Sequence, residues 1–122
     1  MPLFCMIGRD GPQGLERRKL HREAHLANVA PLAEAGRMAY AGPLIDEEGQ
    51  PCGSVLIFES SDLAAARAFA AGDPYVVEGV FASHEVIETR AVVSQAVDGH
   101  GLASSPSTPQ SGATGSGDDR RL

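Results

Sequence analysis

The sequence contains no tryptophan and has few aromatic or cysteine residues. Aromatic side chains make up 5% of the 122 residues, and the two cysteines are Cys5 and Cys52. The hydrophobic core must therefore be mainly aliphatic. The cysteines lack the CxxC spacing of redox motifs and have no recognisable His and Asn setting for a nucleophile, so we expect two thiols that take no part in catalysis.

Basic residues are also in the minority. Lys and Arg number 10 against 16 Asp and Glu, which gives a formal net charge of −6 and disfavours attraction to phosphate backbones or anionic lipids. No apolar run approaches the roughly 18 to 20 residues of a membrane helix, and the first residues lack the pattern of an export signal. We therefore predict a cytoplasmic protein that has neither nucleic acid nor a membrane as a partner.

The composition changes near Asp98. Residues 98–122 consist mostly of glycine, serine, proline and threonine. Such a segment has almost nothing to bury, which predicts a disordered tail, with a short recruitment peptide as the alternative. Residues 1–97 suffice for one domain with one core, and we place the chemistry there.

Strand and helix patterns alternate within residues 1–97. Short β-prone apolar runs occur at residues 3–7, 37–42, 53–59 and 80–88. Apolar positions at helical spacing predict a long helix over about 13–35, with Pro31 as a kink and Gly36 as its end. Ser61 and Asp62 open a second, alanine-rich helix, with Ser61 as the expected N-cap. The order β-α-β-β-α-β predicts a ferredoxin-like α+β fold, an antiparallel sheet with two helices on one face.

Two of the expected strands contain a run that has no polar residue. "LFCMI" and "VLIF" are apolar at every position, whereas a strand with one solvated face alternates apolar and polar residues. Because two helices cover only one face, we expect the other face to pack against a second subunit in a homodimer. The alternative is a monomer whose tail folds across the sheet.

Two segments together resemble a known family. "HREAHLANVAPLAEAGRMAYAGPL" and "GSVLIFESSDLAAARAFAAGDPYVVEGVF" are similar to the YciI-like family of small dimeric α+β proteins, related in fold to muconolactone isomerases and dimeric α/β-barrel proteins. The resemblance covers residues 3 to about 90. Its most telling positions, in chain order, are His25, Leu26, Gly42, Pro43, Gly53, Ser54, Asp73, Pro74 and Tyr75.

The resemblance implies a dimeric α/β-barrel assembly and an active site built on a His and Asp pair, matched here by His25 and Asp73. It also implies that most members lack an assigned reaction, with a dehydrochlorinase of a chlorinated hydroquinone among those that have one. The short loop at 45–52 and the polar tail depart from the family pattern, which leaves the substrate open.

A His and carboxylate pair suits proton transfer, because the carboxylate orients the imidazole and makes it a better proton acceptor. His25 would be the general acid or base and Asp73 its orienting partner, within hydrogen-bonding distance in a solvent-open cleft near Gly42, Pro43 and Ser54. Helix position alone favours a structural role for His25, at the edge of the buried stripe. The other interpretation of Asp73 is a turn carboxylate that caps the backbone.

Five residues are candidates for binding the substrate. They are Tyr40, Gly42, Pro43, Ser54 and Tyr75. The hydroxyl groups of the two tyrosines and the serine offer hydrogen bonds to an oxygenated molecule. Tyr75 has a structural alternative, a half-buried ring whose hydroxyl reaches water.

Several other polar groups favour structural interpretations. His21 and His25 have a metal-binding spacing, but the Glu of "HREAH" is misplaced for a zinc motif, and the acidic run at 46–48 is typical of a solvated hairpin tip. We therefore predict no metal and no cofactor. His84 shares a strand face with apolar residues, which favours a core or interface position. Arg18 and Arg22 either bind a substrate carboxylate or solvate the helix, and solvation is favoured for Arg18.

These observations favour a small-molecule enzyme. We expect proton transfer on a cyclic or aromatic oxygenated substrate, as an isomerisation or as an elimination such as dehydrochlorination. The alternative is a non-catalytic module for ligand binding or assembly.

Overall fold

The structure is a computed structural model of the chain, and it describes residues 1–95 and 97. The tail predicted to be disordered, residues 98–122, lies outside the described residues. The domain boundary at residue 97 therefore stays a prediction. No helix in the described part of the chain is long and apolar enough to cross a membrane.

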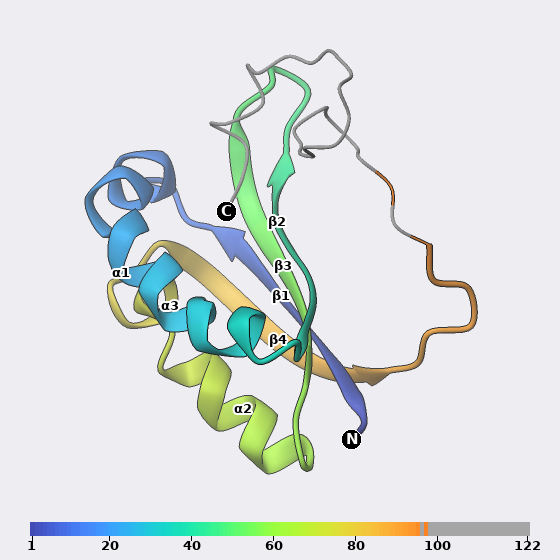
Figure 1. The fold of residues 1–122 in the computed structure, drawn as a ribbon. Helices are drawn as coiled ribbons and strands as arrows, with labels where there is room; N and C mark the ends of the chain where they lie inside the picture. The colour runs from blue at the N-terminus through green and yellow to red at the C-terminus, as the bar shows by residue number, and fades with distance from the viewer. Residues whose placement is uncertain (96, 98–122) are drawn as a thin grey trace.

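The described residues form a four-stranded antiparallel sheet with all helices on one face (Figure 1). The elements are β1 (Leu3–Asp10), α1 (Gly14–Glu34), β2 (Met38–Ile45), β3 (Pro51–Glu59), α2 (Leu63–Ala71), α3 (Pro74–Val77) and β4 (Phe81–Thr89). The strand order is β2-β3-β1-β4, and each neighbouring pair is antiparallel. This confirms the predicted ferredoxin-like α+β fold, to which the short helix α3 is an addition.

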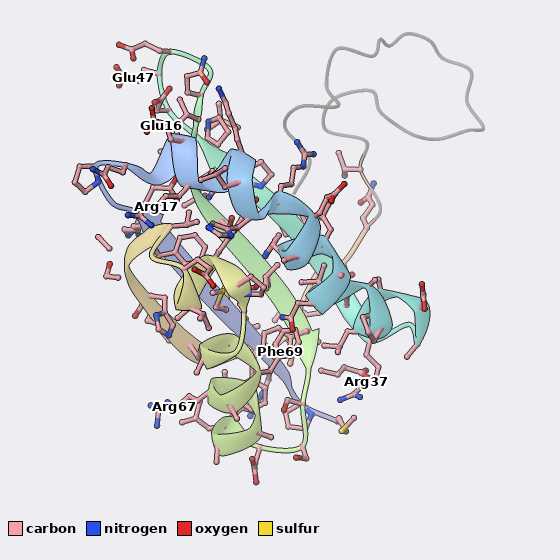
Figure 2. All side chains as sticks on the ribbon, turned by 90° about the vertical axis from the view of Figure 1, so that its left-hand side faces the viewer. Glu16, Arg17, Arg37, Glu47, Arg67 and Phe69 are labelled. Atoms are coloured by element: carbon pink, nitrogen blue, oxygen red, sulfur yellow. The ribbon has the colours of Figure 1, made fainter. Side chains whose placement is uncertain are left out.

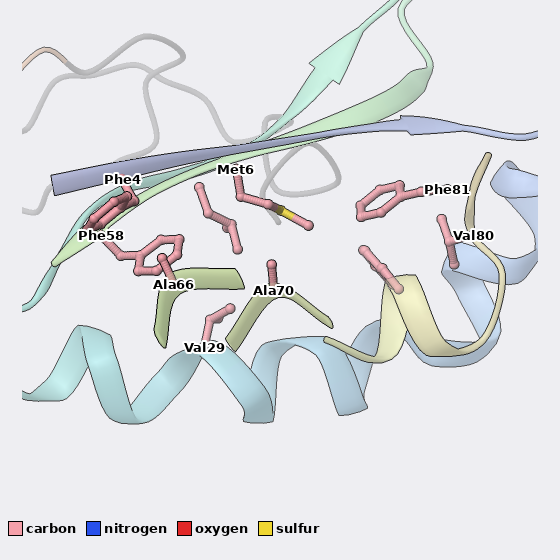
Figure 3. Close-up of a cluster of buried hydrophobic side chains, with 10 residues drawn as sticks. Phe4, Met6, Val29, Phe58, Ala66, Ala70, Val80 and Phe81 are labelled. Atoms are coloured by element: carbon pink, nitrogen blue, oxygen red, sulfur yellow. The ribbon is translucent and has the colours of Figure 1, made fainter. Parts of the chain in front are cut away.

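The core lies between the sheet and the helices. Phe4 and Met6 project from β1 toward the helices, where Val29, Ala66 and Ala70 meet them (Figure 3). The small alanine side chains let α2 approach the sheet closely, so few aromatic residues are needed to fill the space. The core is nevertheless not purely aliphatic, because phenylalanine and tyrosine rings contribute to it.

None of the described helices lies on the opposite face of the sheet (Figure 1). In the strand register, Cys5 lies directly across from Ile57 on β3 and from Ile87 on β4, so all three side chains share this open face. Tyr40 is on the same face of β2, and both Tyr40 and Ile87 are more than half exposed. The middle of the open face is therefore apolar, and nothing in the described part of the chain covers it.

The end of α1 agrees with the sequence-based expectation, whereas the start of α2 differs from it. α1 ends at Glu34, and Gly36 follows with φ of +73°, as expected for a glycine that stops a helix. The N-cap of α2 is Asp62 and not Ser61, because the Asp62 carboxylate accepts a hydrogen bond from the Ala65 amide at 2.8 Å. A carboxylate at this position also complements the helix dipole.

The β2–β3 hairpin has a shorter loop than expected, because the strands extend to Ile45 and from Pro51. The Asp46 carboxylate accepts hydrogen bonds from the Glu48 and Gln50 amides at 2.8 and 2.9 Å, which closes the turn. Glu47 projects from its tip (Figure 2). The acidic run is thus the solvated hairpin tip that the sequence indicated.

His84 does not occupy the core. Its side chain is exposed on β4, an edge strand, and the prediction of a core histidine was wrong for the single chain. The strand register places His84 across from Gly8, on the helix-facing side, but the helices do not cover it there. Its alternative place, a subunit interface, stays a prediction.

Candidate active site

The segment between α2 and α3 holds the carboxylate of Asp73 in place. Gly72 is the C-cap of α2, and Asp73 follows in extended conformation as the N-cap of α3, with Pro74 in the first helical turn. The Asp73 Oδ1 atom accepts a hydrogen bond from the Tyr75 amide at 2.8 Å. The capping role considered for Asp73 is therefore present, and it fixes the direction of the carboxylate.

The same carboxylate contacts His25 on α1. The Nδ1 atom of His25 lies 2.8 Å from Oδ1 and 3.0 Å from Oδ2 of Asp73, within the predicted hydrogen-bonding distance. One carboxylate thus caps a helix and bonds an imidazole, so the two interpretations of Asp73 are not exclusive. The cap prevents the carboxylate from turning away from the ring.

This bond determines what the rest of the imidazole can do. An ionised carboxylate only accepts hydrogen bonds, so Nδ1 of His25 is the donor. In the neutral ring the other nitrogen, Nε2, then carries a lone pair. Nε2 of His25 is buried, and it has no hydrogen-bond partner in the described part of the chain. A histidine held in this way presents a proton acceptor at Nε2.

The pair does not lie in an open cleft, contrary to the prediction. Both His25 and Asp73 have 0% of their surface exposed. The physical reason is the ring of Tyr75, which stacks on the imidazole with centroids 4.0 Å apart and an angle of 3° between the planes. The segment that supplies the carboxylate therefore also covers one face of the histidine.

Tyr75 is itself buried, with 1% of its surface exposed, so the structural alternative of a half-buried ring was wrong. Its ring contacts both His25 and the guanidinium of Arg18, whose Cζ atom is 5.0 Å from the ring centroid. Burial raises the pKa of the Tyr75 hydroxyl above its usual 10.0, although the nearby Arg18 and Arg22 charges oppose the shift. Tyr75 is therefore a neutral phenol at physiological pH.

Arg18 is not a solvated helix residue, as the sequence had favoured, but a buried one with 6% of its surface exposed. Its Nε and Nη2 atoms donate to the two carboxylate oxygens of Asp10 at 2.7 and 3.0 Å, and Nη2 also donates to Ser54 Oγ at 3.0 Å. The forked ion pair is what allows a guanidinium to be buried.

Sequence reasoning missed Asp10, which ends β1 just before the glycine-bearing turn. The sequence did carry one signal that Arg18 is buried, namely its helical spacing from His25. Arg18 precedes His25 by seven residues, which places the two within about 20° of each other around α1. A charged residue on the buried stripe of a helix needs a buried partner of opposite charge, and Asp10 at the end of the preceding strand supplies one.

The candidate substrate-binding residues fall on two faces of the sheet. Ser54 is buried on the helix-facing side, and Pro43 lies across from it in the register. Tyr40 and Gly42 lie on the open face. The Tyr40 hydroxyl covers Gly42, because a Cβ atom added to this glycine would lie only 2.7 Å from the hydroxyl oxygen. The structure therefore brings Ser54 and Tyr75 together around Arg18 but leaves Tyr40 and Gly42 on the far side of the sheet from His25.

No metal-binding group is evident in the described residues. Nowhere in them do three or more His, Cys, Asp or Glu side chains gather as potential ligands. Nδ1 of His25 is bonded to Asp73, so this nitrogen is not free to ligate a metal together with His21. Cys5 and Cys52 are free thiols, and burial, together with the charge of Glu85, raises the pKa of Cys5. A raised pKa makes Cys5 a poorer nucleophile.

Comparison with known proteins gives relatives over most of the described chain. An uncharacterized protein of Haemophilus influenzae is 39% identical over 85 residues, and Protein YciI of Escherichia coli O6:H1 is 38% identical over 85 residues. Each alignment covers 65% of this chain and 87% of the relative.

One solved structure is similar in both sequence and fold. It is the 5-chloro-2-hydroxyhydroquinone dehydrochlorinase of Burkholderia phenoliruptrix AC1100 in complex with 2,5-dihydroxybenzoquinone, with a TM-score of 0.63 and 29% identity. The match covers 72% of this chain and 93% of that one. The model of the YCII-related domain matches residues 2–90. The chain therefore belongs to the YCII-related domain family, as the resemblance in its sequence had predicted.

Proposed function

We propose that this protein is an enzyme that transfers protons on a small cyclic or aromatic oxygenated molecule, by isomerisation or by elimination of a leaving group. One observation carries the proposal. Asp73 holds Nδ1 of His25 at 2.8 Å, while Nε2 of the same ring is buried and has no hydrogen-bond partner among the described residues. A fixed imidazole with one unused nitrogen is the arrangement that general acid and base catalysis requires.

The proposed reaction begins with His25 as the base. Nε2 takes a proton from a substrate hydroxyl, or from a carbon next to a carbonyl, and the Asp73 carboxylate stabilises the imidazolium that forms. In an isomerisation His25 returns the proton to another carbon. In an elimination a leaving group such as chloride departs with the bonding electron pair, and the net loss is one proton and one chloride ion.

The surroundings of His25 favour this role. Tyr75 covers one face of the imidazole and Asp73 bonds its edge, so the ring cannot rotate freely. Water is excluded from the pair, which strengthens the interaction of the carboxylate with a protonated ring. Because the pair is buried, the proposed substrate reaches Nε2 only when the side chains around it move apart.

The similar solved structure supports the choice of substrate. The dehydrochlorinase is named for a chlorinated, hydroxylated ring, and its complex contains an oxygenated ring. At 29% identity we carry over the class of molecule and the type of reaction as a proposal for this chain. The Arg18 and Ser54 side chains supply polar groups on the same side of the sheet as His25.

The test uses two reactions. Chloride release from 5-chloro-2-hydroxyhydroquinone reports elimination, and deuterium exchange into the ring of 2,5-dihydroxybenzoquinone, followed by NMR, reports proton transfer. We expect wild type to accelerate at least one reaction and His25→Gln to lose the acceleration. Binding of both molecules with no acceleration by wild type would show a ligand-binding module and contradict the enzyme.

We also propose that the protein is a homodimer in which a second copy covers the open face of the sheet. The support is the row of apolar side chains that Cys5, Ile57 and Ile87 share on that face. An apolar sheet face of this kind is normally covered, and a two-fold related copy offers a complementary surface.

A further inference from the structure

Two residues within one turn of α1 each carry a buried side-chain nitrogen that has no hydrogen-bond partner among the described residues. Among the described residues, the buried side-chain nitrogens that lack a hydrogen-bond partner are His25 Nε2, Asn28 Nδ2 and Arg37 Nε. His25 and Asn28 are three residues apart in one helix, so their Cβ atoms are about 5–6 Å apart and lie about 60° from each other around the axis.

Arg37 belongs to another region. It follows α1, and its Nη2 atom already donates to the Glu59 carbonyl at 3.1 Å. Figure 2 shows it at the opposite end of α1 from Arg17. The Nε atom of Arg37 therefore lies in a different part of the fold, whereas His25 and Asn28 are a pair of residues within one turn of α1.

Buried polar atoms in folded proteins nearly always have a partner, so such a pair calls for an explanation. The two atoms have different chemistry. Nε2 of His25 is a proton acceptor, because Asp73 fixes the proton on Nδ1, whereas Nδ2 of Asn28 is a donor only. No hydrogen bond links the two atoms. A molecule that satisfied both would give a proton at one end and accept a hydrogen bond at the other.

We propose that Asn28 is a catalytic residue that binds the substrate oxygen on which negative charge develops during proton removal by His25. This inference rests on the function proposed above and adds a residue and a substrate requirement to it. The substrate must be a conjugated oxygenated ring in which a carbonyl or phenol oxygen faces Asn28 while an acidic O–H or C–H faces His25.

The electron and proton balance of the step is simple. The O–H or C–H bond breaks, the proton forms an N–H bond at Nε2 of His25, and the electron pair moves through the ring to the oxygen that faces Asn28. A neutral amide donor suits this oxygen, because it stabilises the developing charge without giving up its own proton. Both side chains are on the 21-residue helix α1, so their relative placement is rigid.

The test compares three variants by two measurements. Asn28→Ala removes the donor, Asn28→Asp keeps the shape but presents an acceptor, and Glu23→Ala is a matched control at an exposed position on the outer side of α1. The measurements are the Kd of 2,5-dihydroxybenzoquinone and the rate of deuterium exchange into its ring. We expect Asn28→Ala to slow exchange about 100-fold while weakening binding by less than about tenfold. Asn28→Asp should slow exchange and weaken binding more than Asn28→Ala does. Glu23→Ala should have the wild-type exchange rate and Kd.

The outcomes separate this inference from the proposed function. If wild type catalyses exchange, His25→Gln abolishes it and both Asn28 variants keep the wild-type rate, the role of Asn28 is wrong while the proposed function stands. Equal losses in Asn28→Ala and Asn28→Asp, accompanied by lower melting temperatures, would make Asn28 structural and also overturn the inference. If wild type catalyses nothing, the proposed function fails together with the catalytic role of Asn28, and unchanged Kd values would exclude even a binding role.

Discussion

The rings of His25 and Tyr75 lie parallel, with centroids 4.0 Å apart. Tyr75 follows Asp73 by two residues. One short segment therefore supplies both the carboxylate that bonds the edge of the imidazole and the ring that covers its face. Pro74 restricts the backbone between them, and the Asp73 cap on the Tyr75 amide fixes the start of α3. The Asp-Pro-Tyr segment therefore acts as one unit that orients His25.

Replacing Asp73 by Asn should separate the two roles of this residue. Asn caps helices as well as Asp, but its amide group can donate to Nδ1 and so move the proton to Nε2 of His25. We expect proton transfer to fall by roughly 100-fold or more, while the free energy of unfolding changes by less than about 1 kcal/mol. Exchange kinetics and urea unfolding give the two values.

Asp62→Asn is the matched control, because Asp62 is also an N-cap but contacts no histidine in the described structure. Its exchange rate should equal that of wild type. An Asp73→Asn variant with the wild-type exchange rate would show that Asp73 is only a cap, and the proposed pair would have to be given up.

The parts of the structure that local patterns control were predictable from the sequence. Apolar runs and helical spacing gave the element order, because each element forms through contacts within a few residues. The pairing of His25 with Asp73 was expected from family resemblance, since nothing local connects residues 48 positions apart. The short helix α3 was missed, because four residues carry too little periodicity to indicate a helix.

Burial was less predictable than topology. Arg18 seemed a surface residue because its burial depends on Asp10 and Ser54, which reach it from two different strands. Similarly, Tyr40 was expected near His25, but the strand register that places it on the open face cannot be read from the sequence of β2 alone.

The Arg18 and Asp10 ion pair should be strongly coupled. Removing one member leaves a buried charge unpaired, so Arg18→Met and Asp10→Asn should each lower the free energy of unfolding by about 3–5 kcal/mol. The double variant leaves no unpaired buried charge. Its free energy of unfolding should therefore fall by clearly less than the sum of the two single losses. A double-mutant cycle by urea unfolding measures the coupling, and additive effects would show that the pair does not stabilise the fold.

The proposed homodimer predicts different effects for two exposed apolar residues. Ile87 lies on the open face of the sheet, whereas Leu20 is exposed on α1, and both are more than half exposed in the single chain. Ile87→Glu should shift the protein to monomers in light scattering at micromolar concentration, and Leu20→Glu should leave the dimer intact. A monomeric wild type, or a dimer unaffected by Ile87→Glu, would contradict the proposed interface.

The buried hydroxyl of Tyr75 predicts how stability changes in alkaline solution. Burial raises the pKa of Tyr75 in the folded protein above 10.0, its value in an unfolded chain. Above that pH the unfolded chain releases the phenol proton while the folded protein retains it. The stabilising contribution is therefore complete below pH 10 and is lost as the pH rises toward the pKa of the folded state.

Tyr75→Phe removes this titration and keeps the ring that stacks on His25. Between pH 9 and 11 the melting temperature of wild type should fall more steeply than that of Tyr75→Phe, whereas the two should run parallel between pH 6 and 8. The pKa of Cys5 is also raised, so Cys5 adds a similar pH dependence of the melting temperature to both proteins. Only the difference in slope between wild type and Tyr75→Phe therefore reports on Tyr75. Parallel curves over the whole range would show that the hydroxyl ionises in the folded protein as easily as in water, and the burial of Tyr75 against His25 would not hold in solution.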